Sequence, residues 1–143
     1  MKSLSAAASL QLPVQLRGIQ LGRPVDLLLD ADVRHAVGYV VLCGDGSQRF
    51  LPYAASQTSE GEVAVASALM LLEDVAFYAT RSVSFRSLLG GEVARNGRHA
   101  GILRDAFVGR DGKVDELELE RGGARRRVPA TGATVVPTRA SAA

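Results

Sequence analysis

The sequence predicts an all-β protein: two tandem small antiparallel β-barrels joined by a short α-helix. A β-rich segment, a glycine turn and a returning segment that ends in proline occur twice, at one constant offset that matches Pro52 with Pro129. Upstream, Asp26 is matched by Asp105 at a slightly larger offset, which predicts two extra residues in the first copy between this aspartate and the next strand. An internal repeat of this kind constrains the fold before any other feature is considered.

Length and composition favour two small units that pack on each other. The chain has 143 residues, of which 47% are hydrophobic and 22% charged; without tryptophan, the core must come from Val, Leu, Ala and Ile. A unit of roughly 60 residues buries only about 60% of its unfolded surface and is marginally stable alone. We expect one copy over residues 10–70, a connector helix over 71–83, a second copy over 84–137 and a disordered tail over 138–143.

Charge and cysteine content point to an ordinary intracellular protein. The net charge is +2, and the single cysteine, Cys43, excludes an internal disulfide and is typical of a reducing compartment. No apolar run reaches the roughly 18–20 residues that a membrane-spanning helix needs. Residues 1–12 make a poor secretory signal, so the expected location is cytoplasmic.

Hydrophobic patterns and turn residues predict the strands of the first copy. The alternating segment 12–16 is typical of a half-buried strand, and the apolar run 24–29 of a strand buried on both faces. Residues 37–43 and 48–51 are predicted to form a hairpin around Asp45-Gly46, because both central residues of a type I′ turn need positive φ. Pro52 ends the returning strand, and residues 62–65 form another.

The connector and the second copy follow in the same way. Residues 71–78 lack glycine and proline, and Leu71, Val75 and Tyr78 form a stripe with helical spacing. The second copy begins near residues 88–90, has turns at 96–97, 111–112 and 122–123, and ends in a short strand at 135–136.

The two copies differ on one face of their central strand. Side chains two residues apart share a strand face, and the constant offset of the repeat aligns two sets of three: Tyr39, Val41 and Cys43 in the first copy, with Glu116, Glu118 and Glu120 in the second. Three carboxylates on one face must be solvated. We therefore expect the matching apolar face to be covered by the connector helix, the other copy or a second chain, which makes it a candidate interaction surface. Val40 and Leu42 are expected on the inner face.

The order of these features resembles the PRC-barrel family. The first copy has Gly22, Asp26, an apolar triplet at 27–29 and the return at 49–52; the second has Gly101, Asp105, residues 106–108 and the return at 127–129, after residues 88–93. The resemblance covers roughly residues 10–137. It implies strongly bent antiparallel barrels and a role in interaction or assembly, with no catalytic residues to carry over. Relatives such as the reaction-centre H subunit and a ribosome-maturation factor have additional segments without counterparts here, so neither specific role is expected.

The repeated aspartates are the first candidates for chemistry. We interpret Asp26 and Asp105 as carboxylates that accept backbone N–H groups, because duplicated placement suggests a role in the fold. An oxygen-rich cation site at Asp26, Asp30 and Asp32 is the alternative, although the loop lacks calcium-loop spacing. Neither histidine has partners spaced for zinc, and Cys43 lies mid-strand, a poor position for a nucleophile.

The last hairpin carries the densest basic cluster, which consists of Arg121, Arg125, Arg126 and Arg127. Attraction to phosphate groups is one interpretation. Alternate residues of a strand point to opposite faces, however, and three glutamates are expected on the neighbouring strand, so cross-strand ion pairs are favoured. Aromatic residues make up only 5% of the chain, which disfavours stacking on single-stranded nucleic acid.

The sequence thus predicts a non-catalytic protein-binding or scaffold module without a cofactor or metal, whose partner is another protein or a second copy. A small barrel filled by its own side chains has no cavity for a substrate, whereas its strands and loops remain available to partners. The alternative is a ribosome- or RNA-associated factor that binds through the hairpin from Arg121 to Arg127. A metal- or ligand-binding enzyme is a more distant alternative.

Overall fold

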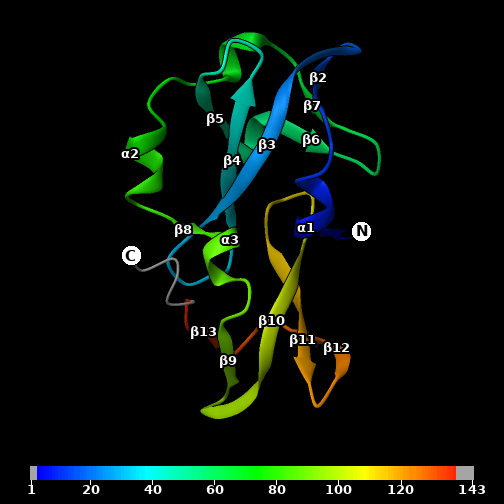
Figure 1. Ribbon diagram of the computed structural model, residues 1–143, viewed down its shortest axis with the longest axis vertical. Coiled ribbons are helices and arrows are strands. Elements are labelled where there is room, and N and C mark those ends of the chain that lie inside the picture. The colour runs from blue at the N-terminus through cyan, green and yellow to red at the C-terminus, as the bar shows by residue number, and fades with distance from the viewer. Residues whose placement is uncertain (1–2, 138–143) are drawn as a thin grey trace.

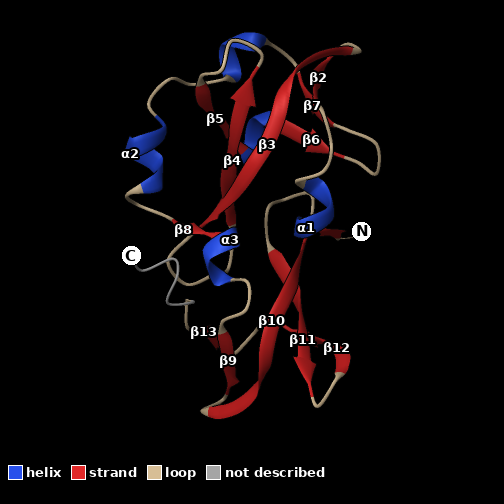
Figure 2. Ribbon diagram, viewed as in Figure 1, coloured by secondary structure: helices blue, strands red, loops and turns tan. Residues whose placement is uncertain are grey.

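Two β-sheets make up most of the chain, and the predicted all-β class is confirmed (Figure 2). The computed structural model describes residues 3–137. Figure 1 shows an elongated molecule in which the first sheet occupies the upper half and the second sheet the lower half. Each sheet contains a long twisted strand, β3 or β10, which runs toward the junction between the halves.

The first sheet has the order β5-β4-β3-β2-β7-β6, with β8 paired to β3. Its strands are β2 (Val14–Leu16), β3 (Ile19–Leu29), β4 (Ala36–Cys43), β5 (Gln48–Pro52), β6 (Ser56–Thr58), β7 (Val63–Val65) and β8 (Val83–Ser84). The β4–β5 turn differs from the predicted type I′ turn, because only Gly46 has positive φ (84°) and Cys43 donates its N–H to Ser47. The loop is therefore longer than two residues.

The second sheet has the order β12-β11-β10-β9-β13, with β1 paired to β10. Its strands are β1 (Leu4–Ser5), β9 (Glu92–Arg95), β10 (Arg98–Val108), β11 (Val114–Arg121), β12 (Ala124–Pro129) and β13 (Ala133–Val135). The turns predicted at 96–97 and 122–123 are confirmed, since all four residues have positive φ between 52° and 82°. Residues 138–143, predicted to be a disordered tail, lie outside the described residues.

Each half of the chain gives a short arm to the sheet of the other half. The first arm consists of β1 and helix α1 (Ala6–Ser9), and the second arm consists of β8 and helix α3 (Phe85–Leu88). The first arm pairs with β10 and the second with β3, and Figure 1 shows α1 and α3 at the junction between the sheets. Residues 4–9, which lie outside both predicted copies, are thus part of the second sheet's architecture.

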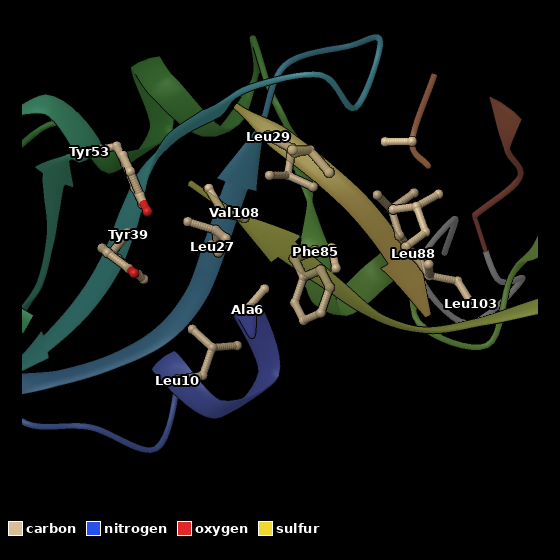
Figure 3. Packing of buried hydrophobic residues seen from close by; sticks show 14 of the residues in the cluster. Ala6, Leu10, Leu27, Leu29, Tyr39, Tyr53, Phe85, Leu88, Leu103 and Val108 are labelled. Atoms are coloured by element: carbon tan, nitrogen blue, oxygen red, sulfur yellow. The ribbon is translucent and has the colours of Figure 1, made fainter. Parts of the chain in front are cut away.

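One hydrophobic core runs through both halves. It includes Tyr39 and Leu51 from the first sheet and Leu103 and Leu119 from the second. The two arms fill the junction, where Figure 3 shows side chains of α1 and α3 beside those of β3 and β10. Phe85 of α3 is fully buried there, so neither sheet has a core that is complete without the other half.

The connector between the halves is mostly not helical. A short 3₁₀ turn, Tyr53–Ala55, lies between β5 and β6, and a second one, Ala68–Met70, precedes the connector. Within the connector, Leu72 is extended and exchanges two backbone hydrogen bonds of 2.8 Å with Phe50 on β5. Helix α2 covers only Val75–Ala79, whereas the prediction began at Leu71. Its start is set by Asp74, whose carboxylate accepts the N–H of Phe77 at 3.1 Å.

A second, smaller hydrophobic cluster lies on the outer face of the first sheet. Leu28, Val40 and Phe50 form it, and Val75 and Tyr78 of the connector pack against it. The rings of Phe50 and Tyr78 are stacked, with centroids 3.9 Å apart. The connector therefore covers part of the outer face of the first sheet, while Leu42 on the same face is 38% exposed.

The structure corrects the predicted alignment of the central strands by one residue. Tyr39 on β4 lies opposite Leu27, and Leu117 on β11 lies opposite Ala106, which is the counterpart of Leu27. Tyr39 therefore corresponds to Leu117 and not to Glu116. One extra residue of the first copy lies between β3 and β4, and the other lies in the β4–β5 hairpin. A slip of one residue exchanges the two faces of a strand.

The candidate interaction surface around Tyr39 is corrected accordingly. Tyr39 and Val41 are 1% and 0% exposed and belong to the shared core, so the expectation that their face is covered is confirmed. They are not available to a partner, because the shared core covers them. Cys43, at the end of β4, is partly buried. The face that matches the three glutamates instead carries Val40 and Leu42.

Candidate interaction surface

The outer face of the second sheet is charged, and we call it the charged face. It consists of Arg104 on β10, Glu116, Glu118 and Glu120 on β11, and Arg125 and Arg127 on β12. Strand alternation places the β11 glutamates on one face, and the register sets Glu118 opposite Arg127 and Glu120 opposite Arg125.

Ion pairs connect the three strands of the charged face. Arg125 lies 3.2 Å from Glu118 and 3.8 Å from Glu120, and Arg104 lies 3.2 Å from Glu120. Arg127 and Glu116 are 3.7 Å apart. The predicted cross-strand ion pairs are confirmed. Each pair is partly exposed and is expected to contribute about 0–1 kcal/mol to stability.

Arg127 also packs over an apolar side chain of the charged face, Phe107. Its guanidinium carbon lies 3.6 Å from the centroid of the Phe107 ring, and Phe107 is only 5% exposed. This geometry is a cation–π contact. Phe107 corresponds to Leu28, which the connector covers in the first half. The equivalent position of the sheet is thus covered by apolar side chains of the connector in one half and by the Arg127 guanidinium in the other.

The four arginines of the last hairpin do not form one patch. Arg125 and Arg127 belong to the charged face, while Arg126, opposite Leu119, points to the other side of β12. Arg121 and Arg126 are exposed and have no carboxylate partner among residues 3–137. The hairpin therefore carries two arginines neutralised by glutamates and two whose charges are available.

Asp26 and Asp105 connect the arms to the sheets. Asp105 accepts the N–H of Ala7 at 3.0 Å and that of Ala106 at 2.7 Å, and it also accepts the hydroxyl of Ser5. The Ser5 hydroxyl oxygen in turn caps α1. The prediction that Asp105 accepts backbone N–H groups is confirmed, although one donor belongs to the opposite half of the chain.

The same arrangement occurs at the second arm. Asp26 accepts the N–H groups of Leu27 (2.8 Å) and Arg86 (3.2 Å) and the hydroxyl of Ser84, which caps α3. Neither Ser5 nor Ser84 was predicted from the sequence to have a role. The available signal was their spacing, since the two serines are separated by the same offset as the two aspartates.

The loop proposed as an alternative cation site is held by its own backbone. Asp30 accepts the N–H groups of Arg34 (2.7 Å) and His35 (3.2 Å), and its other oxygen lies 3.5 Å from the His35 ring. Within residues 3–137, no three histidine, cysteine, aspartate or glutamate side chains are grouped closely enough to hold a metal ion.

A surface cleft lies beside β6 and the β10–β11 turn. It has a volume of about 670 Å³, and Tyr53, Thr58 and Arg110 are among its lining residues. The Tyr53 hydroxyl donates to the Gly109 carbonyl at 3.2 Å, and that of Tyr39 bonds to Thr58 at 2.8 Å. Burial raises the pKa of both phenols. They therefore stay neutral at ordinary pH and act as hydrogen-bonding core residues.

Comparisons with known proteins add no family assignment. The chain matches no protein-family model, and a search of curated proteins finds no similar sequence. None of the helices within residues 3–137 combines the length and the apolar character that crossing a membrane requires.

Proposed function

We propose that the protein is a non-catalytic, cytoplasmic binding module of PRC-barrel type that recognises another protein through the β11–β12 hairpin. The repeated order of aspartate, apolar triplet, hairpin and proline supports the family assignment, and the mainly antiparallel sheets, in which β2 and β7 pair in parallel, are compatible with it. The family's association with assembly favours a binding role.

One observation carries the choice of surface. In the first half, the chain's own connector packs on the hydrophobic cluster of the outer face and pairs with the edge strand β5. In the second half, no segment of residues 3–137 pairs with the outer edge of β12. Within the same residues, Arg121 and Arg126 of this hairpin make no ion pair with a carboxylate. An exposed sheet edge with available charge is a common site of protein recognition.

The alternative partner is RNA, and the same two arginines favour it. Arg121 and Arg126 carry positive charges that phosphate groups would neutralise. Against it stands the pairing of Arg125 and Arg127 with glutamates, which places carboxylates beside the site. An RNA backbone cannot keep its phosphates to one side of the edge, whereas alternate side chains of a protein strand point to opposite faces and can present carboxylates to Arg126 alone, so we favour the protein partner.

Affinity purification of the tagged full-length chain from its own cells tests this function. We expect a polypeptide that co-purifies in constant ratio and remains after ribonuclease treatment. The double variant Arg121→Glu/Arg126→Glu should no longer retain this polypeptide, although the substitutions break no ion pair within residues 3–137. The control Arg34→Glu/Arg110→Glu makes the same change in net charge at exposed arginines elsewhere and should retain it.

The other outcomes would contradict the proposal in distinct ways. Retained RNA, with affinity that falls steeply as salt rises, would support the alternative. A partner that both double variants retain would show that binding does not use the hairpin. A partner that both variants lose would indicate attraction to overall charge.

A further inference from the structure

We propose that the outer edge of β12 binds an acidic, extended segment of a partner protein, which adds a strand to the second sheet. This inference rests on the proposed function and specifies the docking geometry and the chemistry of the partner. It combines three features of the hairpin: the direction of its free backbone groups, a matching pairing in the first half, and the arginines along the strand.

The tight turn fixes which backbone groups of β12 are free. Gly122-Gly123 forms a two-residue loop, so Arg121 and Ala124 form the hydrogen-bonded pair that closes it. Hydrogen-bonded and non-hydrogen-bonded pairs alternate along the strand. At Arg125 and Arg127, the backbone N–H and C=O groups therefore point away from β11. Pro129, the next residue in this phase, has no N–H, as is usual on an edge.

The first half shows a strand residue in the equivalent place. Phe50 on β5 corresponds to Arg127 on β12, because each lies opposite the equivalent residue of the neighbouring strand. Phe50 both donates its N–H to Leu72 and accepts that of Leu72, at 2.8 Å in each case. In the described part of the chain, Arg127 has no such partner. The backbone geometry that accepts one extended residue at β5 is thus repeated at β12, where no segment of residues 3–137 pairs with it.

The side chains of β12 determine the charge of the partner. Three consecutive arginines place positive charge on both faces of the edge. Among them, Arg126 is the one that makes no ion pair with a carboxylate of residues 3–137. An apolar strand laid beside them would desolvate these charges without pairing them. A second copy of β12 would place arginine against arginine. A strand with a carboxylate opposite Arg126 satisfies both the charge and the free backbone groups.

A short labelled peptide of alternating glutamate and threonine is the probe, mixed with the full-length chain at low salt. Fluorescence anisotropy should detect binding tighter than about 1 mM, and amide NMR shifts should concentrate on β12. Methylating alternate backbone nitrogens keeps the charge but prevents strand pairing. This should weaken binding by about tenfold or more, because the added ladder is lost.

Two variants separate charge from position. Arg126→Glu should weaken peptide binding by about tenfold or more, since a favourable charge pair becomes a repulsive one. Arg34→Glu changes net charge equally at a distant exposed site and should have an effect below about twofold. Neither side chain makes an ion pair within residues 3–137, so folding should be unaffected, and circular dichroism checks this.

Several results would overturn the inference. Equal binding of the methylated peptide would mean that charge alone attracts it. Absence of binding near 1 mM, or an unchanged affinity of Arg126→Glu, would mean that the arginines only protect the edge from aggregation. Tighter binding of a short oligouridine that displaces the peptide would assign the edge to RNA. A co-purifying protein that still requires Arg121 and Arg126 would then leave the proposed function standing with a different docking geometry.

Discussion

Replacing Asp105 with alanine should lower the free energy of unfolding by about 3–5 kcal/mol. The carboxylate is 8% exposed and accepts three hydrogen bonds, two of them from Ser5 and Ala7 of the first arm. A hydrogen bond to a charged group contributes about 1.5–3 kcal/mol. The expected loss is smaller than three such values, because Ser5 can rotate and water can reach part of the site. The total free energy of unfolding of a typical domain is only about 5–15 kcal/mol.

Urea unfolding followed by far-ultraviolet circular dichroism measures this loss, since the chain has no tryptophan. Asp105→Asn retains one acceptor oxygen but turns an amide toward Ser5, so we expect a loss of about 1–2 kcal/mol. Asp32→Ala, at an exposed position, is the control and should change stability by less than about 0.5 kcal/mol. A loss below about 1 kcal/mol for Asp105→Ala would refute the reasoning.

A double-mutant cycle with Ser5→Ala tests whether the arm contact itself causes the effect. Because Ser5 and Asp105 are bonded directly, their coupling should reach about 1 kcal/mol. Additive effects would mean that the Ser5 hydroxyl does not contribute to the loss, and would leave the Ala7 N–H as the donor through which Asp105 holds the arm. Faster proteolysis near residues 4–9 in Asp105→Ala would independently indicate that the arm is released.

Three further results are expected. Burial raises the pKa of Tyr39 and Tyr53 above the usual value of 10.0; their stabilising effect is complete below about pH 10 and is lost at higher pH, so their phenolate absorbance should appear only together with unfolding. Tyr78→Ala should cost about 2 kcal/mol, because it removes a stacked ring from the outer cluster, whereas the more exposed Phe77→Ala should cost less than half as much in the same urea titrations. Burial also raises the pKa of the Cys43 thiol, so iodoacetamide should label it more slowly in the folded than in the unfolded protein at the same pH; equal rates would contradict this.

The repeat allowed the fold class and most strands to be predicted, but strand phase was not predictable in β4. Nearly every residue from Val37 to Cys43 is apolar, because the shared core covers one face of this strand and the connector covers the other. Alternation then carries no information about which face is inner. In β11 the glutamates mark the outer face, and there the predicted faces and ion pairs are correct.

The arm exchange was not predictable from local patterns. Ser5 and Asp105 are 100 residues apart in the sequence, as Ser84 and Asp26 are 58. Turn chemistry explains why an aspartate accepts backbone N–H groups, but not which segment donates them. The unpaired edge of β12 was likewise not predictable from the sequence. Whether a strand edge is paired depends on where the connector lies, and the connector pairs only with β5.

The exchanged arms have a consequence for how the two halves can diverge. A polypeptide with a single half would need an identical partner to supply the missing arm, and such a pair would fall apart on dilution. Its symmetry would also repeat every substitution on both sides. Tethering the halves through the connector makes folding unimolecular and allows each outer surface to change alone. Within residues 3–137, the outer face of one half accordingly carries an apolar cluster under the connector, and that of the other half carries ion pairs between its strands.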